Sequence, residues 1–196
     1  MTNLRRAVSC ILLMLSLMAC SRTQTAPAPQ PQKQADQPPT KLEAFLGKRG
    51  RLLIKDSYDL GRISSMGSAE LDALVIYEPG SSQKTKGLRV EVTEGGRLER
   101  SETSFLDLDE LQSLSDALTY MSDLAAKWHG TTHDPYTEVT YVSKGEFSVG
   151  FFQRGTDSNA FISSGMVGPV RAYLKVPDLV RLKQMVDQAK TTLSSK

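Results

Sequence analysis

The chain has 196 residues, 24 of them basic and 22 acidic, with a formal net charge of +2. So small a net charge argues against a polyanion such as nucleic acid as the partner. Two cysteines and two histidines leave few side chains for a disulfide framework, a metal site or a thiol nucleophile.

The N-terminus has the pattern of an export signal. Arg5 and Arg6 precede the uncharged residues 7–19, a stretch typical of a signal peptide and shorter than the about 20 apolar residues of a transmembrane helix. The run Leu17-Met18-Ala19-Cys20 resembles the lipobox of bacterial lipoproteins, although Ala, Ser, Thr or Val is more usual where Met18 stands. The resemblance implies that residues 1–19 are removed and that Cys20 is lipidated, with a diacylglycerol and a further acyl chain such as palmitate. An ordinary signal peptide with a chance cysteine is the alternative.

Removal of the signal would change the charge and the cysteine content of the exported protein. Without Arg5 and Arg6 the mature chain is neutral, and Cys10 leaves with the signal, so no thiol is free for a disulfide, a metal or catalysis. Ser21 follows the lipidated cysteine. In lipoproteins of Gram-negative enteric bacteria an Asp there favours the inner membrane, so under that rule Ser21 implies an anchor in the outer membrane that faces the periplasm.

Residues 20–40 are expected to tether the folded part to the membrane. Residues 21–40 contain five prolines, five glutamines and no apolar side chain larger than alanine, a composition that predicts an extended, disordered spacer. At about 3.1 Å per residue, such a spacer reaches up to roughly 60 Å. Residues 41–196 have the length and composition of a single domain.

Strand patterns occur in two groups of four. Alternating or continuous apolar runs between turn residues predict a strand that starts at 51–55 and strands at 71–77, 88–92 and 103–106, then at 139–141, 147–151, 160–163 and 170–176. An apolar stripe at helical spacing follows each group and predicts helices over 108–127 and 177–193. Asp107 with Glu110 forms a capping-box pattern, and Pro177 suits a first helical position.

The two groups are similar where the last strand meets the helix. Residues 105–114 and 173–182 share the pattern aromatic-Leu-x-aliphatic-x-acid-Leu-x-x-Leu. The sequence therefore predicts an α+β fold of two β-β-β-β-α units, with antiparallel sheets and two amphipathic helices; a pleckstrin-like barrel with an inserted helix is the alternative. A duplication and a chance similarity both remain open.

This element order resembles that of PUR repeats and Whirly proteins, in which paired four-stranded sheets with trailing helices bind single-stranded nucleic acid. The resemblance extends to architecture alone, since one fold hosts many functions. The export signal, the lipid anchor and the neutral mature charge argue against nucleic acid here.

The side chains that carry chemistry are few. His129, His133 and Asp134 lie close in sequence and are candidate metal ligands, but no third ligand stands at a fixed spacing from the histidines, so polar loop residues without a metal or other cofactor are expected. No serine stands in a G-x-S-x-G context. Phe151 and Phe152 are consecutive, so in a strand one of them must point away from the main core.

These patterns favour a non-enzymatic, membrane-anchored binding or assembly module of the cell envelope. Its expected partners are the membrane, through Cys20, and an envelope protein or polymer reached across the spacer. The alternative is a small envelope hydrolase or metal-dependent enzyme that uses the His129 and His133 loop.

Overall fold

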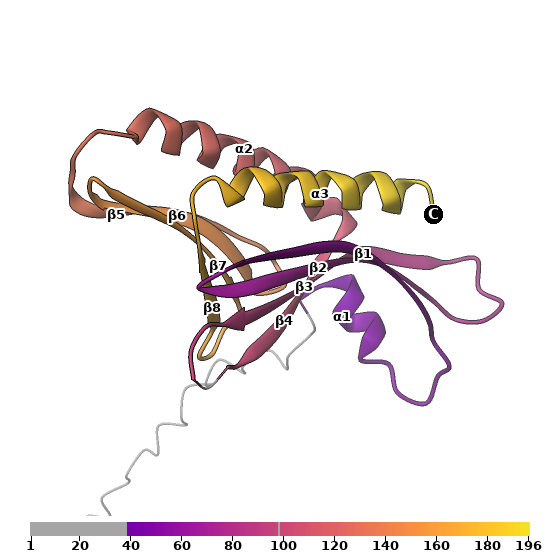
Figure 1. The fold of residues 1–196 in the computed structure, drawn as a ribbon. Helices are drawn as coiled ribbons and strands as arrows, with labels where there is room; N and C mark the ends of the chain where they lie inside the picture. The colour runs from indigo at the N-terminus through magenta and orange to yellow at the C-terminus, as the bar shows by residue number, and fades with distance from the viewer. Residues whose placement is uncertain (1–38, 98) are drawn as a thin grey trace, which may run out of the picture. The chain divides into compact units, whose positions relative to one another are not determined.

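A computed structural model describes residues 39–97 and 99–196 (Figure 1). The predicted signal 1–19, Cys20 and residues 21–38 of the tether lie outside the described residues. The elements, in chain order, are α1 (Lys41–Leu46), β1 (Ile54–Ser65), β2 (Gly67–Tyr77), β3 (Lys84–Glu94), β4 (Ser101–Asp107), the 3-10 turn η1 (Leu108–Glu110), α2 (Leu111–Trp128), β5 (His133–Val142), β6 (Phe147–Gly155), β7 (Asp157–Ser164), β8 (Val170–Leu174) and α3 (Asp178–Ser194).

The strands form two separate antiparallel sheets. The order is β1-β2-β3-β4 in the first sheet and β5-β6-β7-β8 in the second, and each sheet is followed by a long helix, α2 or α3. The predicted α+β fold of two β-β-β-β-α units is therefore confirmed. The sheets are not closed into a barrel, so the barrel alternative is wrong.

The first strand is longer than its sequence pattern indicates. A strand was expected to start within 51–55; β1 begins at Ile54, inside that range, and continues to Ser65. Its register against β2 shifts between Asp59 and Gly61, and Gly61 has φ 113°. Such a bulge interrupts the alternation of inward and outward side chains, so Tyr58 and Leu60, which pack against the core, are out of phase with Ile63 after it.

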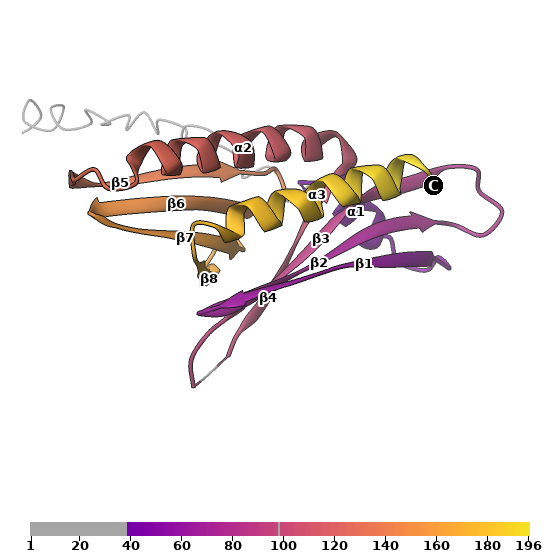
Figure 2. The same ribbon diagram turned by 45° about the horizontal axis from the view of Figure 1, so that its top comes forward.

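Each long helix packs on the sheet of the other unit. α3, which follows the second sheet, lies against β1 and β2, while α2 lies against β5 and β6. The two helices contact each other on the same side of the sheets (Figures 1 and 2), and the Ser115 hydroxyl of α2 donates to the Asp187 carboxylate of α3 at 2.7 Å. One hydrophobic core thus joins both sheets and both helices. None of the helices in the described residues is long and apolar enough to cross a bilayer.

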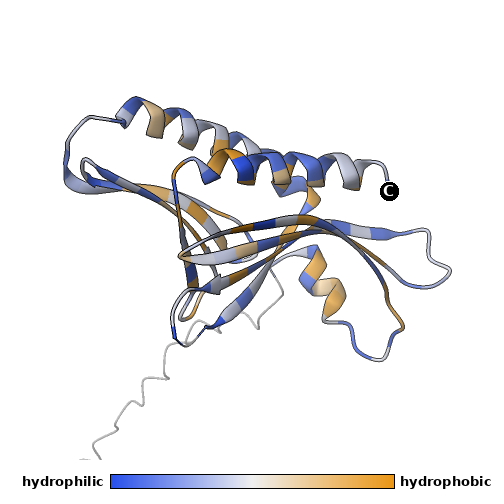
Figure 3. Cartoon of the chain, in the orientation of Figure 1, coloured by the Kyte–Doolittle hydropathy of each residue, from blue (hydrophilic) through white to orange (hydrophobic). Residues whose placement is uncertain are grey.

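A short helix that the sequence analysis missed covers the opposite face of the first sheet. α1 is largely hydrophobic (Figure 3), and Leu42 packs there with Leu74 and Ile76. Thr40 caps α1 in a capping box with Glu43. The Asp107 carboxylate accepts hydrogen bonds from the backbone N–H groups of Lys41 and Leu42, at 2.9 and 3.2 Å. Thr40, which the sequence analysis assigned to the tether, is therefore buried as the first residue of the fold.

The two similar sequence segments have the same local structure. The Glu110 carboxylate accepts a hydrogen bond from the Asp107 N–H at 3.0 Å, and the Asp178 carboxylate accepts one from the Lys175 N–H at 3.0 Å. The predicted capping box at Asp107 and Glu110 is thus present. The shared leucines are all buried: Leu106, Leu111 and Leu114 in the first unit, and Leu174, Leu179 and Leu182 in the second. In both segments the strand is thus joined to the helix by the same contact, a carboxylate that accepts from the backbone N–H three residues earlier.

Candidate functional site

The second sheet has one face toward the helices and one face away from them. Phe151 is fully buried in the core shared with the helices, whereas Phe152 is half-buried and lies outside that core. The prediction that one of these two rings points away from the main core is confirmed. Strand register places Glu138, Phe152, Phe161, Arg171 and Tyr173, among other side chains, on the face of Phe152, which we call the outer face.

At the middle of the outer face an aromatic ring lies on a glycine. A Cβ atom at Gly150 would lie 2.9 Å from Cζ of Phe161 and 2.3 Å from the carbonyl oxygen of Val139. On its other side, the Phe161 ring is covered by the guanidinium group of Arg171, whose carbon lies 4.2 Å from the ring centroid. Phe161 is fully buried by this arrangement although it lies outside the helix-side core. Gly150 therefore makes the space that lets Phe161 hold Arg171 on the sheet.

Three further aromatic rings form a cluster across the strands. Phe152 lies 5.5 Å from Tyr136 and 6.3 Å from Tyr173, measured between ring centroids. The two tyrosines are exposed, Tyr136 at 53% and Tyr173 at 40%. Aromatic pairs at such separations support one another, and each tyrosine presents an apolar ring with a polar end. The cluster is therefore a partly apolar surface open to solvent, in which each ring contacts another.

Glu138 and Arg171, two charged groups of the outer face, differ in their partners. The carboxylate of Glu138 accepts hydrogen bonds from the hydroxyls of Tyr136 at 2.5 Å and Thr140 at 2.8 Å. Burial opposes ionisation of Glu138, but these bonds and the charge of Arg171 outweigh it and lower its pKa. The bond to Glu138 in turn raises the pKa of Tyr136. Within residues 39–97 and 99–196, Arg171 makes no ion pair.

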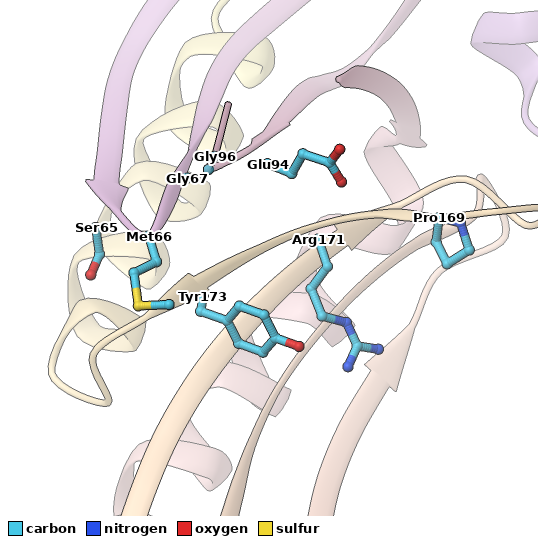
Figure 4. A pocket seen from close by; sticks show the side chains of 9 residues that line it. Ser65, Met66, Gly67, Glu94, Gly96, Pro169, Arg171 and Tyr173 are labelled. Carbon is cyan, nitrogen blue, oxygen red and sulfur yellow. The ribbon is translucent and has the colours of Figure 1, made fainter. Parts of the chain in front are cut away.

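A hollow of about 660 Å³ lies between β8 and the first sheet, lined by Ser65, Met66, Gly67, Glu94, Gly95, Gly96, Pro169, Arg171 and Tyr173. Arg171 and Tyr173 project to the same side of β8 there (Figure 4). Met66, in the β1–β2 turn, exchanges two backbone hydrogen bonds with Tyr173, at 2.9 and 3.1 Å. The hollow thus joins the aromatic cluster to the junction of the two sheets, and its volume is in the range of ligand sites.

The histidine candidates lie elsewhere. His129 is the exposed C-cap of α2 and borders a separate hollow of about 450 Å³ beside α3. His133 begins β5, and its ring lies 4.3 Å from that of Trp128. Among the described residues, His129, His133 and Asp134 do not form a group of three with ligand atoms within 4.8 Å of one another. Stacking on Trp128 gives His133 a packing role.

Such a group of three is formed by Asp107, Asp109 and Glu110 instead. Glu110 accepts from the backbone N–H of Lys144 at 2.8 Å as well as from that of Asp107, and Asp107 caps α1. Asp109 pairs with the Lys41 ammonium at 3.0 Å, a hydrogen bond that lowers the pKa of Asp109 and raises that of Lys41. These acids therefore connect α1, the start of α2 and the β5–β6 turn.

The consecutive Phe151 and Phe152 were recognisable in the sequence, whereas Arg171 and the hollow were not predicted. The outer face is made of side chains from four strands and depends on strand register and on the contact between the sheets. A local sequence pattern does not indicate either of these. No family model matches the sequence, and no curated protein or solved structure matches it. The site is accordingly assigned on its own geometry: an exposed aromatic cluster beside a hollow with one guanidinium group.

Proposed function

We propose that this chain is a bacterial envelope lipoprotein, anchored through Cys20, whose folded domain is a non-enzymatic module that binds an envelope protein or polymer through the outer face of the second sheet. The lipobox-like run at 17–20 supports the anchor, and Ser21 supports an outer-membrane location facing the periplasm. The exposed cluster of Tyr136, Phe152 and Tyr173 is the observation that carries the binding role.

The chemistry of this surface suits recognition. Tyr and Arg are enriched among the residues that dominate binding energy, because they bury a large area and also supply hydrogen bonds. Exposed apolar side chains that gather in one place are typical of interaction sites. Tyr136 and Tyr173 meet through Phe152, and the conformation of Arg171 is supported by Phe161. These side chains are therefore already positioned before a partner binds, so binding would cost little of their conformational entropy.

The proposed function is tested by photo-crosslinking in cells. A photoreactive amino acid replaces Tyr136 in one variant and Tyr120 in a matched control; Tyr120 lies on α2 and is 64% exposed. The expected result is a discrete crosslinked product, identified by mass spectrometry, at position 136 and none at position 120. Equal crosslinking at the two positions would contradict a binding role for the outer face.

The anchor and the spacer are tested in the same cells. Cys20→Ser should abolish incorporation of labelled palmitate and remove the crosslinked product, because the domain would no longer be held near its partner. Deletion of residues 22–39 should reduce the product while the purified domain keeps its melting temperature. Full crosslinking by the shortened chain would show that the spacer has no positional role.

A further inference from the structure

Strand β8 has a backbone edge that is only partly used. The N–H of Tyr173 donates to the carbonyl of Met66, and the carbonyl of Tyr173 accepts from the N–H of Met66. Both backbone groups of Tyr173 therefore point away from β7. Because alternate residues of an antiparallel strand direct their backbone groups to the same side, the N–H and C=O of Arg171 point away from β7 as well.

The first sheet supplies a partner for Tyr173 alone. The contact between Met66 and Tyr173 is an isolated bridge, since Gly67 already begins β2 and pairs with Glu94 of β3. The N–H and C=O of Arg171 make no backbone hydrogen bond outside the sheet within the part of the chain that the structure describes. Unpaired groups on a strand edge are a template for an added strand, and extended peptides bind proteins in this way.

The charge of the hollow is set by Arg171. It is the only basic residue among the nine that line the hollow. The one acid of the lining, Glu94, is held by the Arg100 guanidinium through two hydrogen bonds of 2.7 and 2.8 Å, which lower the pKa of Glu94. The nearby Glu138 is influenced by the charge of Arg171, but its two carboxylate oxygens accept from Tyr136 and Thr140, and within the described residues it makes no ion pair with Arg171. An arriving carboxylate would therefore meet a guanidinium group that is not already paired.

We propose that this hollow binds an acidic, extended polypeptide segment of a partner protein, with the Arg171 guanidinium on a carboxylate and the free N–H and C=O of Arg171 on the peptide backbone. Met66 and Tyr173, both exposed beside it, supply the apolar contact. The inference rests on the proposed binding function and specifies the partner. An acidic glycan would satisfy Arg171 and Tyr173, but its hydroxyls do not repeat a donor and an acceptor at the spacing of a β-strand, so the free backbone groups favour a polypeptide.

The test is a selection of random octapeptides on the purified full-length protein in detergent. Peptides that contain Asp or Glu between β-branched residues should be enriched. For a synthetic copy of an enriched peptide, Arg171→Gln should weaken binding by about tenfold or more, as should Asn or Gln in place of the peptide's acid. Arg171→Lys should lose less affinity for the peptide than Arg171→Gln. Arg181→Gln, on the exposed side of α3, should bind the peptide as tightly as the unchanged protein. N-methylation of alternate peptide nitrogens should also abolish binding.

Three outcomes would overturn the inference: neutral enriched peptides, binding that does not depend on Arg171, or unchanged binding after N-methylation of every backbone nitrogen. Arg171-dependent binding of an oligogalacturonate, without any enriched peptide, would assign the hollow to an acidic glycan instead. Circular dichroism and melting temperature establish that each variant is folded. The proposed function is tested separately, because a crosslink at position 136 without an enriched acidic peptide would retain the binding role and reject only this partner chemistry.

Discussion

The guanidinium carbon of Arg171 lies 4.2 Å from the centroid of the Phe161 ring, on the outer face of the second sheet. Phe161 lies in turn on Gly150, in the neighbouring strand. The three residues form a stack in which a glycine, a buried ring and a cation follow one another. The position of the cation is thus determined by a residue that has no side chain.

The first prediction concerns the base of this stack. Gly150→Ala should destabilise the domain by about 1–3 kcal/mol in urea denaturation, because the new Cβ would meet a backbone oxygen and the Phe161 ring within distances that require both to move. Ser148→Ala, two residues away in β6, is the control and should change the stability by less than about 0.5 kcal/mol. If Gly150→Ala left the free energy of unfolding unchanged, Phe161 would not pack on Gly150.

The second prediction concerns the packing of α3 on the first sheet. A Cβ at Gly61 would lie 3.7 Å from Cε of the buried Met185. Met185→Ala should cost about 2–5 kcal/mol, and the largest amide chemical-shift changes outside α3 should occur around Gly61. Val180→Ala, at a solvent-exposed position of α3, should leave the amide chemical shifts around Gly61 unchanged. Shifts confined to β5–β8 would contradict the arrangement of the helices.

The third prediction concerns the attachment of α1. Asp107→Ala removes the acceptor for the Lys41 and Leu42 N–H groups and should cost about 1–2 kcal/mol. Hydrogen exchange of these two amides should become faster, whereas amides of α3 change little. Asp107→Asn keeps one acceptor oxygen and should have a smaller effect. Equal effects of the two substitutions would argue against the capping role.

The fourth prediction is a pH dependence at the helix–helix contact. Burial opposes ionisation of Asp187, but hydrogen bonds from Lys183 and Ser115 outweigh this effect and lower its pKa below 3.8. Since the folded state binds the proton less tightly than the unfolded state, this contribution is present above about pH 4 and disappears as the pH falls through the lowered value. Asp187→Asn should therefore cost up to about 1 kcal/mol at neutral pH and progressively less below pH 4, measured by thermal unfolding.

The control for the pH series is Asp123→Asn, at an exposed position of α2. Its difference from the unchanged protein should be small and should not vary in this way with pH. A cost of Asp187→Asn that increases below pH 4 would contradict the direction of the pKa shift.

The fifth prediction separates binding from the metal-enzyme alternative. We expect metal-free protein to take up no stoichiometric zinc in equilibrium dialysis, because His133 stacks on Trp128 and does not form a ligand group with His129 and Asp134. Uptake of one zinc per chain that is lost in the His129→Ala/His133→Ala double variant would support the alternative. Trp128, the only tryptophan, should change its fluorescence on His133→Ala and not on His129→Ala.

The sequence by itself determined the order of the elements and both long helices. Apolar residues at a spacing of two or of about 3.6 are local patterns, and burial of one face follows from them directly. The strand-to-helix junctions at Asp107 and Lys175 were also predictable, because the acid three residues ahead contacts its own chain. The Thr40 and Glu43 capping box carried a similar signal for α1, but six residues are too few for a helical stripe to stand out.

Only the tertiary structure decided which surfaces meet. An amphipathic stripe indicates that a helix is buried without specifying the sheet that buries it, so the packing of α3 on the first sheet could not be predicted. The outer face arises in the same way: Phe161 and Arg171 are ten residues apart in sequence, and strand register makes them neighbours over Gly150. Contacts between distant segments depend on how strands pair and sheets pack, which is settled by the whole chain at once rather than by any one segment.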